Sequence, residues 1–265
     1  MTKLLTYADR VTIAVTDRIA DVRLARPDKM NAIDPAMFTG IGAAIDALAA
    51  RDDVRCVVLS GDGRGFCAGL DMVSMAAGGS GVSRDRNDHG AILPQHVSWG
   101  WRTLPMPVIA AVHGVAFGGG FQIMSGADIR IAAPDTRFAI REVHWGLVPD
   151  MAGFALWRSL VRDDVLRELV YTAREFDAGE AVALGFVTRL ADDPRAAAMD
   201  LAAAIAGRSP HAIRGAKRLL NMAHDADPRT MLEAETAEQV KVIGKPNMME
   251  AVAANMAKRA PVFED

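Results

Sequence analysis

The feature of this sequence that most constrains its fold is an apolar run that passes through a glycine triplet into a second apolar run. Residues 107–114 have the sequence PVIAAVHG, a short continuous apolar stretch typical of a strand buried on both faces. The chain continues as VAFGGGFQIMSGAD, where three glycines precede a helix-like segment whose first polar side chain is Gln122. Glycines here let a ligand approach backbone N–H groups at the start of the helix. We therefore expect an α/β fold with a binding site at this turn.

A second apolar run has the same construction. Residues 54–61, VRCVVLSG, predict another buried strand, and the glycine-rich loop DGRGFCAGLDM follows it. Because no lysine accompanies the triplet, its turn suits a developing oxyanion better than a full phosphate. One N–H group from each loop would then meet at a single oxygen and form an oxyanion hole. The alternative is that both loops are tight connections in which glycine serves only steric needs.

Familiar glycine-rich motifs are absent from this stretch. A dinucleotide-binding fingerprint counted from Gly118 and Gly120 would place its third glycine at Ile123. A nucleotide-binding loop would need Lys-Ser or Lys-Thr where Phe121 and Gln122 stand. No serine stands in the G-x-S-x-G pattern of a nucleophile elbow.

Composition limits the classes of function further. The 265 residues are 51% hydrophobic, which suits one large core or a core plus an extension. The formal net charge is −3 with both signs interspersed, so we expect neither nucleic acid nor a membrane as a partner. The six histidines and two cysteines fit no metal-binding pattern, so we expect no metal. The N-terminus has no targeting pattern, which favours a cytoplasmic location.

Periodicity and turn residues divide the chain into an α/β core, residues 1–195, and a helical C-terminal region, residues 196–265. Residues 76–90 combine low hydrophobicity with four glycines, so we expect a mobile loop or lid there. The segments ADIRIAAP and TRFAIRE are expected to form a strand pair. Further strands are expected at 11–15 and 19–24, and helices from Pro35 and at 151–161, 163–173, 178–184, 194–207, 210–224 and 228–257.

Several segments together resemble one known family. They are ARPDKMNAI, GFCAGLDM, PVIAAVHGVAFGGGFQIMSGADIRIA, FAIREVHWGLVPDMAG and AKRAPVF, which run in order from about residue 22 to 263. This combination resembles the enoyl-CoA hydratase/isomerase (crotonase) superfamily. The resemblance implies a crotonase-like spiral of ββα repeats with a helical C-terminal trimerisation region, assembled as a homotrimer or hexamer. It also implies an acyl-CoA substrate and no cofactor, because coenzyme A is part of the substrate.

The resemblance also implies roles for residues of the glycine loops. The thioester oxygen would accept N–H bonds from Leu70 and Gly119 while the α-carbon becomes enolate-like. Candidate residues for substrate and CoA binding are Arg26, Lys29, Ala32, Ala68, Asp71, Met72, Phe117, Gly118 and Pro149. Arg26 and Lys29 are equally compatible with solvated surface charge. Lys258 and Arg259 would either reach the CoA of a neighbouring subunit or cap the last helix.

The matching positions leave the reaction open. Hydratases of the superfamily use two glutamates on one water; here the first position is Gln122, an amide that cannot take a proton, and the second is Glu142. The dienoyl-CoA isomerase branch pairs acids matching Glu142 and Asp150 to move a proton between carbons, although it usually has an acid at the position of Gln122 as well. We favour isomerisation over hydration by a single glutamate. A non-catalytic acyl-CoA-binding homologue is the third alternative.

Both carboxylates also have structural interpretations. Glu142 lies beside the apolar Trp145 in the sequence, which favours a raised pKa, but it could instead form an ion pair with Arg141. Asp150 could cap a helix that begins at Met151. These alternatives make different predictions about hydrogen-bond partners.

Overall fold

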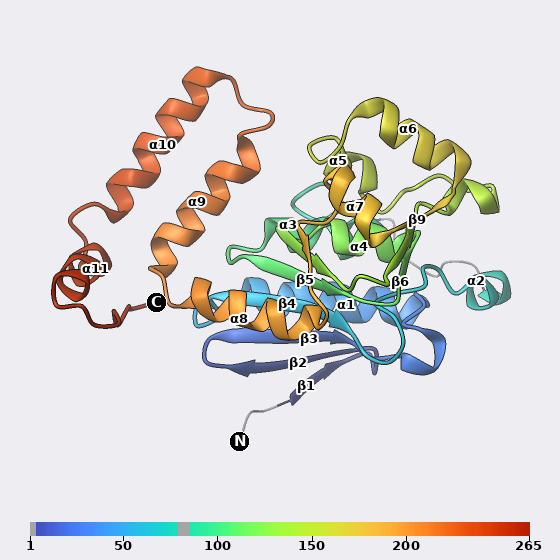
Figure 1. The fold of residues 1–265 in the computed structure, drawn as a ribbon, viewed down its shortest axis with the longest axis horizontal. Helices are drawn as coiled ribbons and strands as arrows, with labels where there is room; N and C mark the ends of the chain where they lie inside the picture. Colours follow the sequence, from blue (N-terminus) through green and yellow to red (C-terminus); the bar gives the residue numbers. More distant parts are fainter. Residues whose placement is uncertain (1–3, 79–84) are drawn as a thin grey trace.

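The computed structural model describes residues 4–78 and 85–265 of the chain. Its main sheet has seven strands in the order β1-β2-β3-β4-β5-β7-β10 (Figure 1). β1 to β3 pair antiparallel, and every later pair in the sheet is parallel. The strands are β1 (Leu4–Tyr7), β2 (Val11–Thr16), β3 (Ile19–Leu24), β4 (Cys56–Gly61), β5 (Val108–Val112), β7 (Ile129–Ala132) and β10 (Arg189–Leu190).

A smaller sheet of three strands stands beside the main one. It contains β6 (Val115–Phe117), β8 (Arg137–Ala139) and β9 (Glu175–Asp177) in that order. The prediction that ADIRIAAP and TRFAIRE pair with each other is wrong. Their strands β7 and β8 belong to different sheets, because β7 continues the parallel ladder of β5 whereas β8 pairs with β6. A turn closed by the bond from Thr136 N to Ala133 O, 3.1 Å, separates the two strands.

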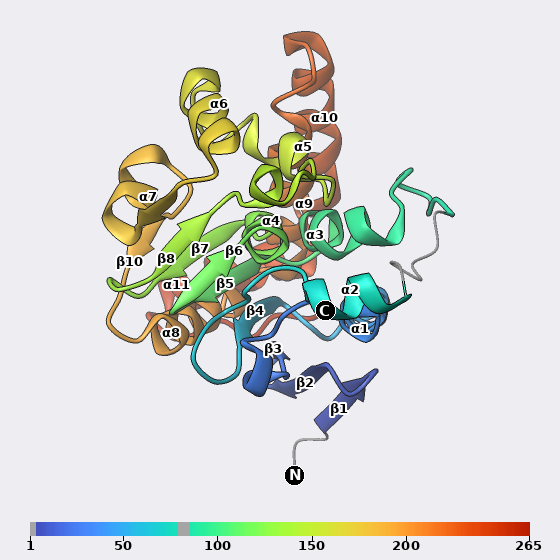
Figure 2. The same ribbon diagram turned by 90° about the vertical axis from the view of Figure 1, so that its right-hand side faces the viewer.

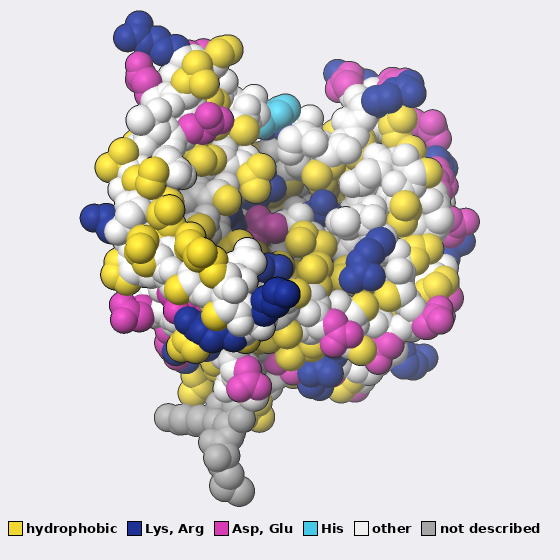
Figure 3. Space-filling view, turned by 60° about the vertical axis from the view of Figure 1, so that its left-hand side comes forward, with side chains coloured by type: hydrophobic (Ala, Val, Ile, Leu, Met, Phe, Trp, Pro, Cys, Tyr) yellow, Lys and Arg dark blue, Asp and Glu magenta, His cyan; other side chains and the backbone are white. Residues whose placement is uncertain are grey.

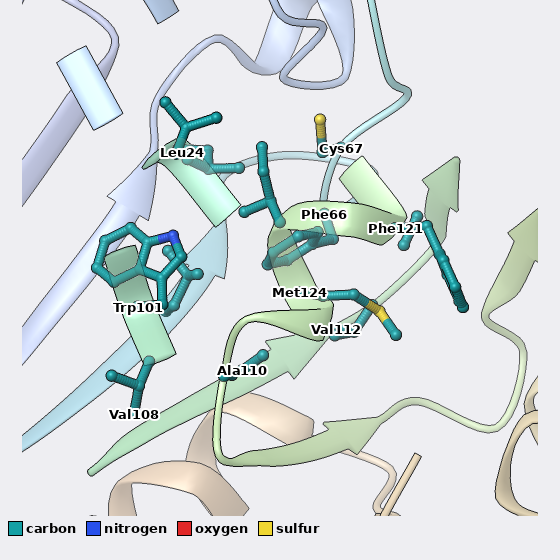
Figure 4. Packing of buried hydrophobic residues seen from close by; sticks show 14 of the residues in the cluster. Leu24, Phe66, Cys67, Trp101, Val108, Ala110, Val112, Phe121 and Met124 are labelled. Atoms are coloured by element: carbon teal, nitrogen blue, oxygen red, sulfur yellow. The ribbon is translucent and has the colours of Figure 1, made fainter. Parts of the chain in front are cut away.

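The central strands are apolar on both faces because different helices cover the two faces. Val57 and Ala110 enter a large core with Phe121, whereas Val58 and Ile109 pack with alanines of α8 (Pro194–Ala206). Figure 2 shows α8 and α1 (Pro35–Ala49) on opposite sides of the sheet, and Figure 4 shows the large core around β5. This confirms both predicted buried strands.

The first helix of the core begins at a recognisable cap. Asp34 accepts the N–H of Met37 at 2.8 Å and Pro35 fills the first position of α1, as the sequence predicts. The remaining elements on this part are η1 (Pro27–Lys29), α2 (Met72–Gly78), α3 (Leu93–Thr103), α4 (Gly119–Ser125), η2 (Glu142–Trp145), α5 (Gly153–Trp157), α6 (Asp163–Thr172) and α7 (Ala178–Leu184).

The C-terminal helices form an arm that leaves the core (Figure 1). It consists of α9 (Pro210–Met222), α10 (Pro228–Val242) and α11 (Pro246–Met256). The predicted single helix 228–257 is wrong, because Gly244 adopts a φ of +69° and Pro246 has no N–H to continue the helical ladder. The predicted division after residue 195 would cut α8 near its start and remove it from the sheet that it covers.

Two further predictions concern the segment 76–90 and the membrane. Of the segment 76–90, residues 79–84 lie outside the described residues, so the lid stays a prediction. In the described ranges, no helix combines the length and the apolar character that crossing a membrane would require.

Candidate active site

The two glycine loops lie against each other along β6. Cys67 donates its N–H to Val115 O and accepts that of Phe117, each at 3.0 Å, so the loop after β4 pairs with the strand before the triplet. Gly69 follows this pairing with a φ of +91°. A Cβ atom at Gly69 would lie 2.7 Å from Phe117 O and 3.7 Å from Gly119 N. The close approach of the loops therefore requires glycine at this position.

The opposite side of the same loop is held by Ile33. Its N–H donates to Gly69 O at 2.8 Å, and its carbonyl accepts the N–H of Asp71 at 2.9 Å. The Leu70 N–H between these bonds has no protein acceptor in the described ranges, and neither has the N–H of Gly119 at the start of α4. Two adjacent loops thus each offer one free backbone donor. Since α4 has only seven residues, we base the site on these two donors and not on a helix dipole.

Each glycine of the triplet meets a different requirement. Gly118 has a φ of +49° and a ψ of −117°, which disfavours other residues. A Cβ atom at Gly119 would lie 2.9 Å from the Met151 sulfur. One at Gly120 would lie 2.4 Å from Cys67 O. The triplet therefore reflects one backbone conformation and two close contacts.

A cavity of about 480 Å³ opens beside these loops. It brings together all five residues predicted for catalysis and the oxyanion hole, and four of the nine predicted for substrate binding. Its lining consists of Ala68, Gly69, Leu70, Met72, Phe117, Gly118, Gly119, Gln122, Arg141, Glu142, Trp145, Leu147, Val148, Asp150 and Met151. The predicted binding residues Arg26, Lys29, Ala32, Asp71 and Pro149 do not line it.

Gln122 is buried at the base of the cavity, with 1% of its surface exposed. Its side-chain oxygen accepts the N–H groups of Met151 at 2.9 Å and Gly153 at 3.0 Å. Its side-chain nitrogen donates to Glu142 Oε1 at 2.6 Å. The amide therefore joins the turn that carries Glu142 to the segment that follows Asp150.

Glu142 lies in η2 with 6% of its surface exposed, next to Gly118. Its Oε2 atom is buried and has no hydrogen-bond partner within residues 4–78 and 85–265. Burial raises the pKa of Glu142 above its ordinary value, and the negative charge of Asp150 raises it further. Hydrogen bonds from Gln122 and from backbone N–H groups oppose this shift. The ion pair with Arg141 considered from the sequence is not formed, because Arg141 Nη1 instead binds Glu175 at 2.8 Å.

Asp150 stands at the rim of the cavity, and partial burial raises its pKa. It does not cap a helix at Met151. The next helix, α5, begins at Gly153 after Ala152, a residue with a φ of +68° whose side chain makes no capping bond. Asp150 and Glu142 line the same cavity.

The mouth of the cavity is apolar. Trp145 is 55% exposed, and Leu147 and Val148 follow it with exposed side chains. On the inner wall, the guanidinium carbon of Arg141 lies 5.3 Å from the centre of the Phe117 ring. Gly69, Arg141, Val148 and Met151 were missed as lining residues, although Val148 lies between Glu142 and Asp150 in the sequence and the other three each adjoin a predicted site residue.

Two of the cations considered for CoA binding, Arg26 and Arg259, have partners within the chain. Arg26 Nη1 donates to Ala32 O and binds Asp71 Oδ2, both at 2.9 Å, and thereby ties together the two loops predicted to hold CoA. Arg259 binds Glu250 and lies just after α11. These contacts agree with a role in holding the backbone.

Lys29 is exposed, and no ion pair to it is present in the described part of the chain. Lys258, at the end of α11, has a φ of +51°. It donates its N–H to Asn255 O at 3.1 Å, a bond typical of a helix end. No group of three metal-ligating side chains occurs among the described residues.

A family model described as enoyl-CoA hydratase/isomerase matches residues 15–265. The chain belongs to the enoyl-CoA hydratase/isomerase family. It is therefore related to enzymes that act on acyl-CoA thioesters, with the same mixed α/β fold followed by C-terminal helices.

The chain is similar to family members named as isomerases and to others named as hydratases. It is 31% identical to the mitochondrial Delta(3,5)-Delta(2,4)-dienoyl-CoA isomerase of Mus musculus, over 91% of this chain and 77% of that protein. It is 32% identical to enoyl-CoA hydratase EchA19 of Mycobacterium tuberculosis, over 92% of each. The crystal structure of an enoyl-CoA hydratase from Bacillus anthracis matches with a TM-score of 0.87 and 27% identity, over 96% of this chain and 98% of that one. Because these relatives include both an isomerase and hydratases, they leave the reaction of this enzyme open.

Proposed function

We propose that this enzyme moves a double bond within an unsaturated acyl-CoA by proton transfer. Leu70 and Gly119 would donate their N–H groups to the thioester oxygen and stabilise the enolate. Glu142 and Asp150, which line the same cavity, would be the proton-transfer groups. For a 3,5-dienoyl thioester, one group removes a proton from C2, the electrons spread onto the thioester oxygen, and the other group protonates C6. The product is the 2,4-dienoyl thioester.

The observation that carries this choice is the hydrogen bonding of Gln122. A hydratase must orient a water for attack on carbon, and an amide oxygen at this position would be one of its acceptors. Both lone pairs of the Gln122 oxygen are already used by Met151 and Gly153, and the amide cannot remove a proton. Of the two positions that hydratases of the superfamily use on the water, only Glu142 is still an acid. Proton transfer between carbons needs no such water.

The apolar mouth and the backbone donors support a neutral acyl chain in the cavity. Because the donors and both acids belong to the chain itself, we propose that no metal and no cofactor takes part beyond the CoA of the substrate. The binding residues outside the cavity, Arg26 and Lys29 among them, stay predictions for the CoA end. A cytoplasmic location also stays a prediction.

We also propose a homotrimer or hexamer formed through the C-terminal arm. The face that carries the arm exposes many hydrophobic side chains (Figure 3). Those on or beside the arm include Leu220, Leu232, Val240, Ile243, Met249, Val252, Met256 and Val262. Light scattering of the purified chain tests the assembly.

The reaction is tested with 2-enoyl, 3-enoyl and 3,5-dienoyl thioesters in D2O. We expect a conjugated product detected by its ultraviolet absorbance, with solvent deuterium incorporated and no mass of added water. Glu142→Gln and Asp150→Asn should each lower kcat by about 10²- to 10⁴-fold. Asp164→Asn, an exposed acid on α6, is the matched control and should be unaffected. Addition of water to a 2-enoyl thioester as the main reaction would overturn the proposal, as would acyl-CoA binding without turnover.

A further inference from the structure

We propose that Gln122 is a positioning residue: a neutral bridge that fixes both proton-transfer groups and keeps Glu142 as the single acid on its side of the cavity. This inference rests on the proposed function, in which Glu142 and Asp150 carry the protons. It assigns to the amide a role that an acid at the same place could not fill.

The orientation of the amide follows from its partners. Two backbone N–H groups, of Met151 and Gly153, point at one end of the side chain, so this end must be the oxygen. The other end must then be the NH2 group, which faces Glu142 Oε1 at 2.6 Å. A hydrogen bond from an NH2 group to a carboxylate is stronger than one to a neutral acceptor, so this orientation of the amide is favoured. The three hydrogen bonds of the Gln122 side chain therefore all select the same rotamer and the same orientation of its amide group.

The bridge makes the two oxygens of Glu142 unequal. Oε1 is occupied by the Gln122 NH2 group, whereas Oε2 is buried without a partner among the described residues. A proton that arrives at Glu142 therefore has Oε2 as its free position. The same bridge holds the backbone of Met151 and so fixes the residue before it, Asp150. One side chain aligns both carboxyl groups.

Few other charges act on Glu142. Within its own turn, Arg141 is paired with Glu175, and His144 packs edge to face on Trp145. On α6, which packs against this turn, the charged side chains pair with neighbours: Asp163 with Arg167, Glu168 with Arg174, and Asp164 with Arg162. Asp150 lines the same cavity, and its negative charge contributes to the raised pKa of Glu142.

A glutamate at position 122 would change this balance in a definite direction. Two carboxylates at 2.6 Å cannot both be ionised in a buried site, so they would share one proton. The new carboxylate would accept the N–H groups of Met151 and Gly153, which favours its charged form. The proton would then reside on Glu142. Gln122→Glu would therefore hold Glu142 protonated to a higher pH.

The first test is the pH dependence of kcat/KM. In Gln122→Glu, whichever limb of the profile belongs to Glu142 should move to higher pH by roughly one unit or more. Gln122→Met, which keeps the length but neither donates nor accepts, should lower kcat more than tenfold with a smaller change in KM. Ser125→Ala, a buried polar change on the same helix outside the cavity, is the control and should keep the wild-type profile. A Gln122→Glu profile that superimposes on the wild type would overturn the inference.

The second test needs no activity and so separates this inference from the proposed function. Urea unfolding is measured from pH 5 to 9 for the wild type, Gln122→Glu, and the exchanged pair Gln122→Glu with Glu142→Gln. We expect Gln122→Glu to lose stability with rising pH more steeply than the wild type, because its folded state keeps the shared proton to a higher pH than wild-type Glu142 keeps its own. The exchanged pair has a single acid, at position 122, whose charged form the N–H groups of Met151 and Gly153 favour, so its stability should fall with rising pH less steeply than that of Gln122→Glu. Parallel slopes for all three proteins would show that the two side chains are not coupled.

Discussion

The glycine loops predict that Gly69→Ala destroys more activity than its effect on stability explains. Alanine at a φ of +91° costs about 1–2 kcal/mol in backbone strain. Its Cβ atom would also lie 2.7 Å from the backbone oxygen of Phe117, which cannot move freely because the Phe117 N–H is bonded to Cys67. Such overpacking adds about 1–3 kcal/mol. Relief of the contact must displace the Leu70 N–H from the cavity.

Gly244→Ala provides the matched control. Gly244 has a φ of +69°, and its added Cβ atom would meet nothing within 4 Å. The control therefore carries the backbone strain, about 1–2 kcal/mol, without the contact. Both variants are compared by urea unfolding, and their kcat and KM are measured well below the unfolding midpoint.

Loss of one oxyanion donor should lower kcat in Gly69→Ala by about 10²- to 10³-fold, equivalent to roughly 3–4 kcal/mol of barrier. Gly244→Ala should keep its kcat. If Gly69→Ala is no less stable than Gly244→Ala and loses less than about tenfold in kcat, the loops are tight connections and not an oxyanion hole.

Two further predictions concern buried charges. Lys217→Met should destabilise the chain by about 3 kcal/mol in urea unfolding, because it leaves Asp128, now bound at 2.7 Å, without its cation; a loss below about 1 kcal/mol would contradict this role in attaching α9. Glu142→Gln should be as stable as the wild type at pH 4 and more stable at pH 8. The folded state holds the Glu142 proton more tightly than the unfolded chain, so wild-type stability falls as the pH rises through the raised pKa. A stability difference independent of pH would contradict the buried charge.

The sequence predicted those parts of the fold that local pattern determines. Short apolar runs became β4 and β5 because helices cover both faces of the sheet, and Asp34 with Pro35 marked the start of α1. The break of the last predicted helix was also visible locally, since Gly244 and Pro246 stand two residues apart. The prediction of a single helix over residues 228–257 gave too much weight to the length of the apolar pattern.

The local sequence pattern did not predict which distant segments pair with each other. β7 and β8 are both short strands with buried residues, but they join different sheets, because β7 pairs with β5 and β8 pairs with β6. Gln122 illustrates the same limit at the site. Its place two residues after the triplet identified it, yet its bonds connect it to residues 20, 29 and 31 positions further along the chain. Likewise, Arg26 gave no local signal that it would bind Asp71.

The two donors of the site are main-chain groups, and this separates two kinds of change that the chain can accept. Except for proline, no substitution at Leu70 deletes its N–H, so the proposed capacity to hold a thioester oxygen is inherited with the backbone shape that the glycines permit. The positions of Gln122, Glu142 and Asp150 can then be altered one at a time while the two backbone donors proposed to activate the substrate are kept. Redesign of the reaction should accordingly begin with these three side chains and leave the glycines untouched.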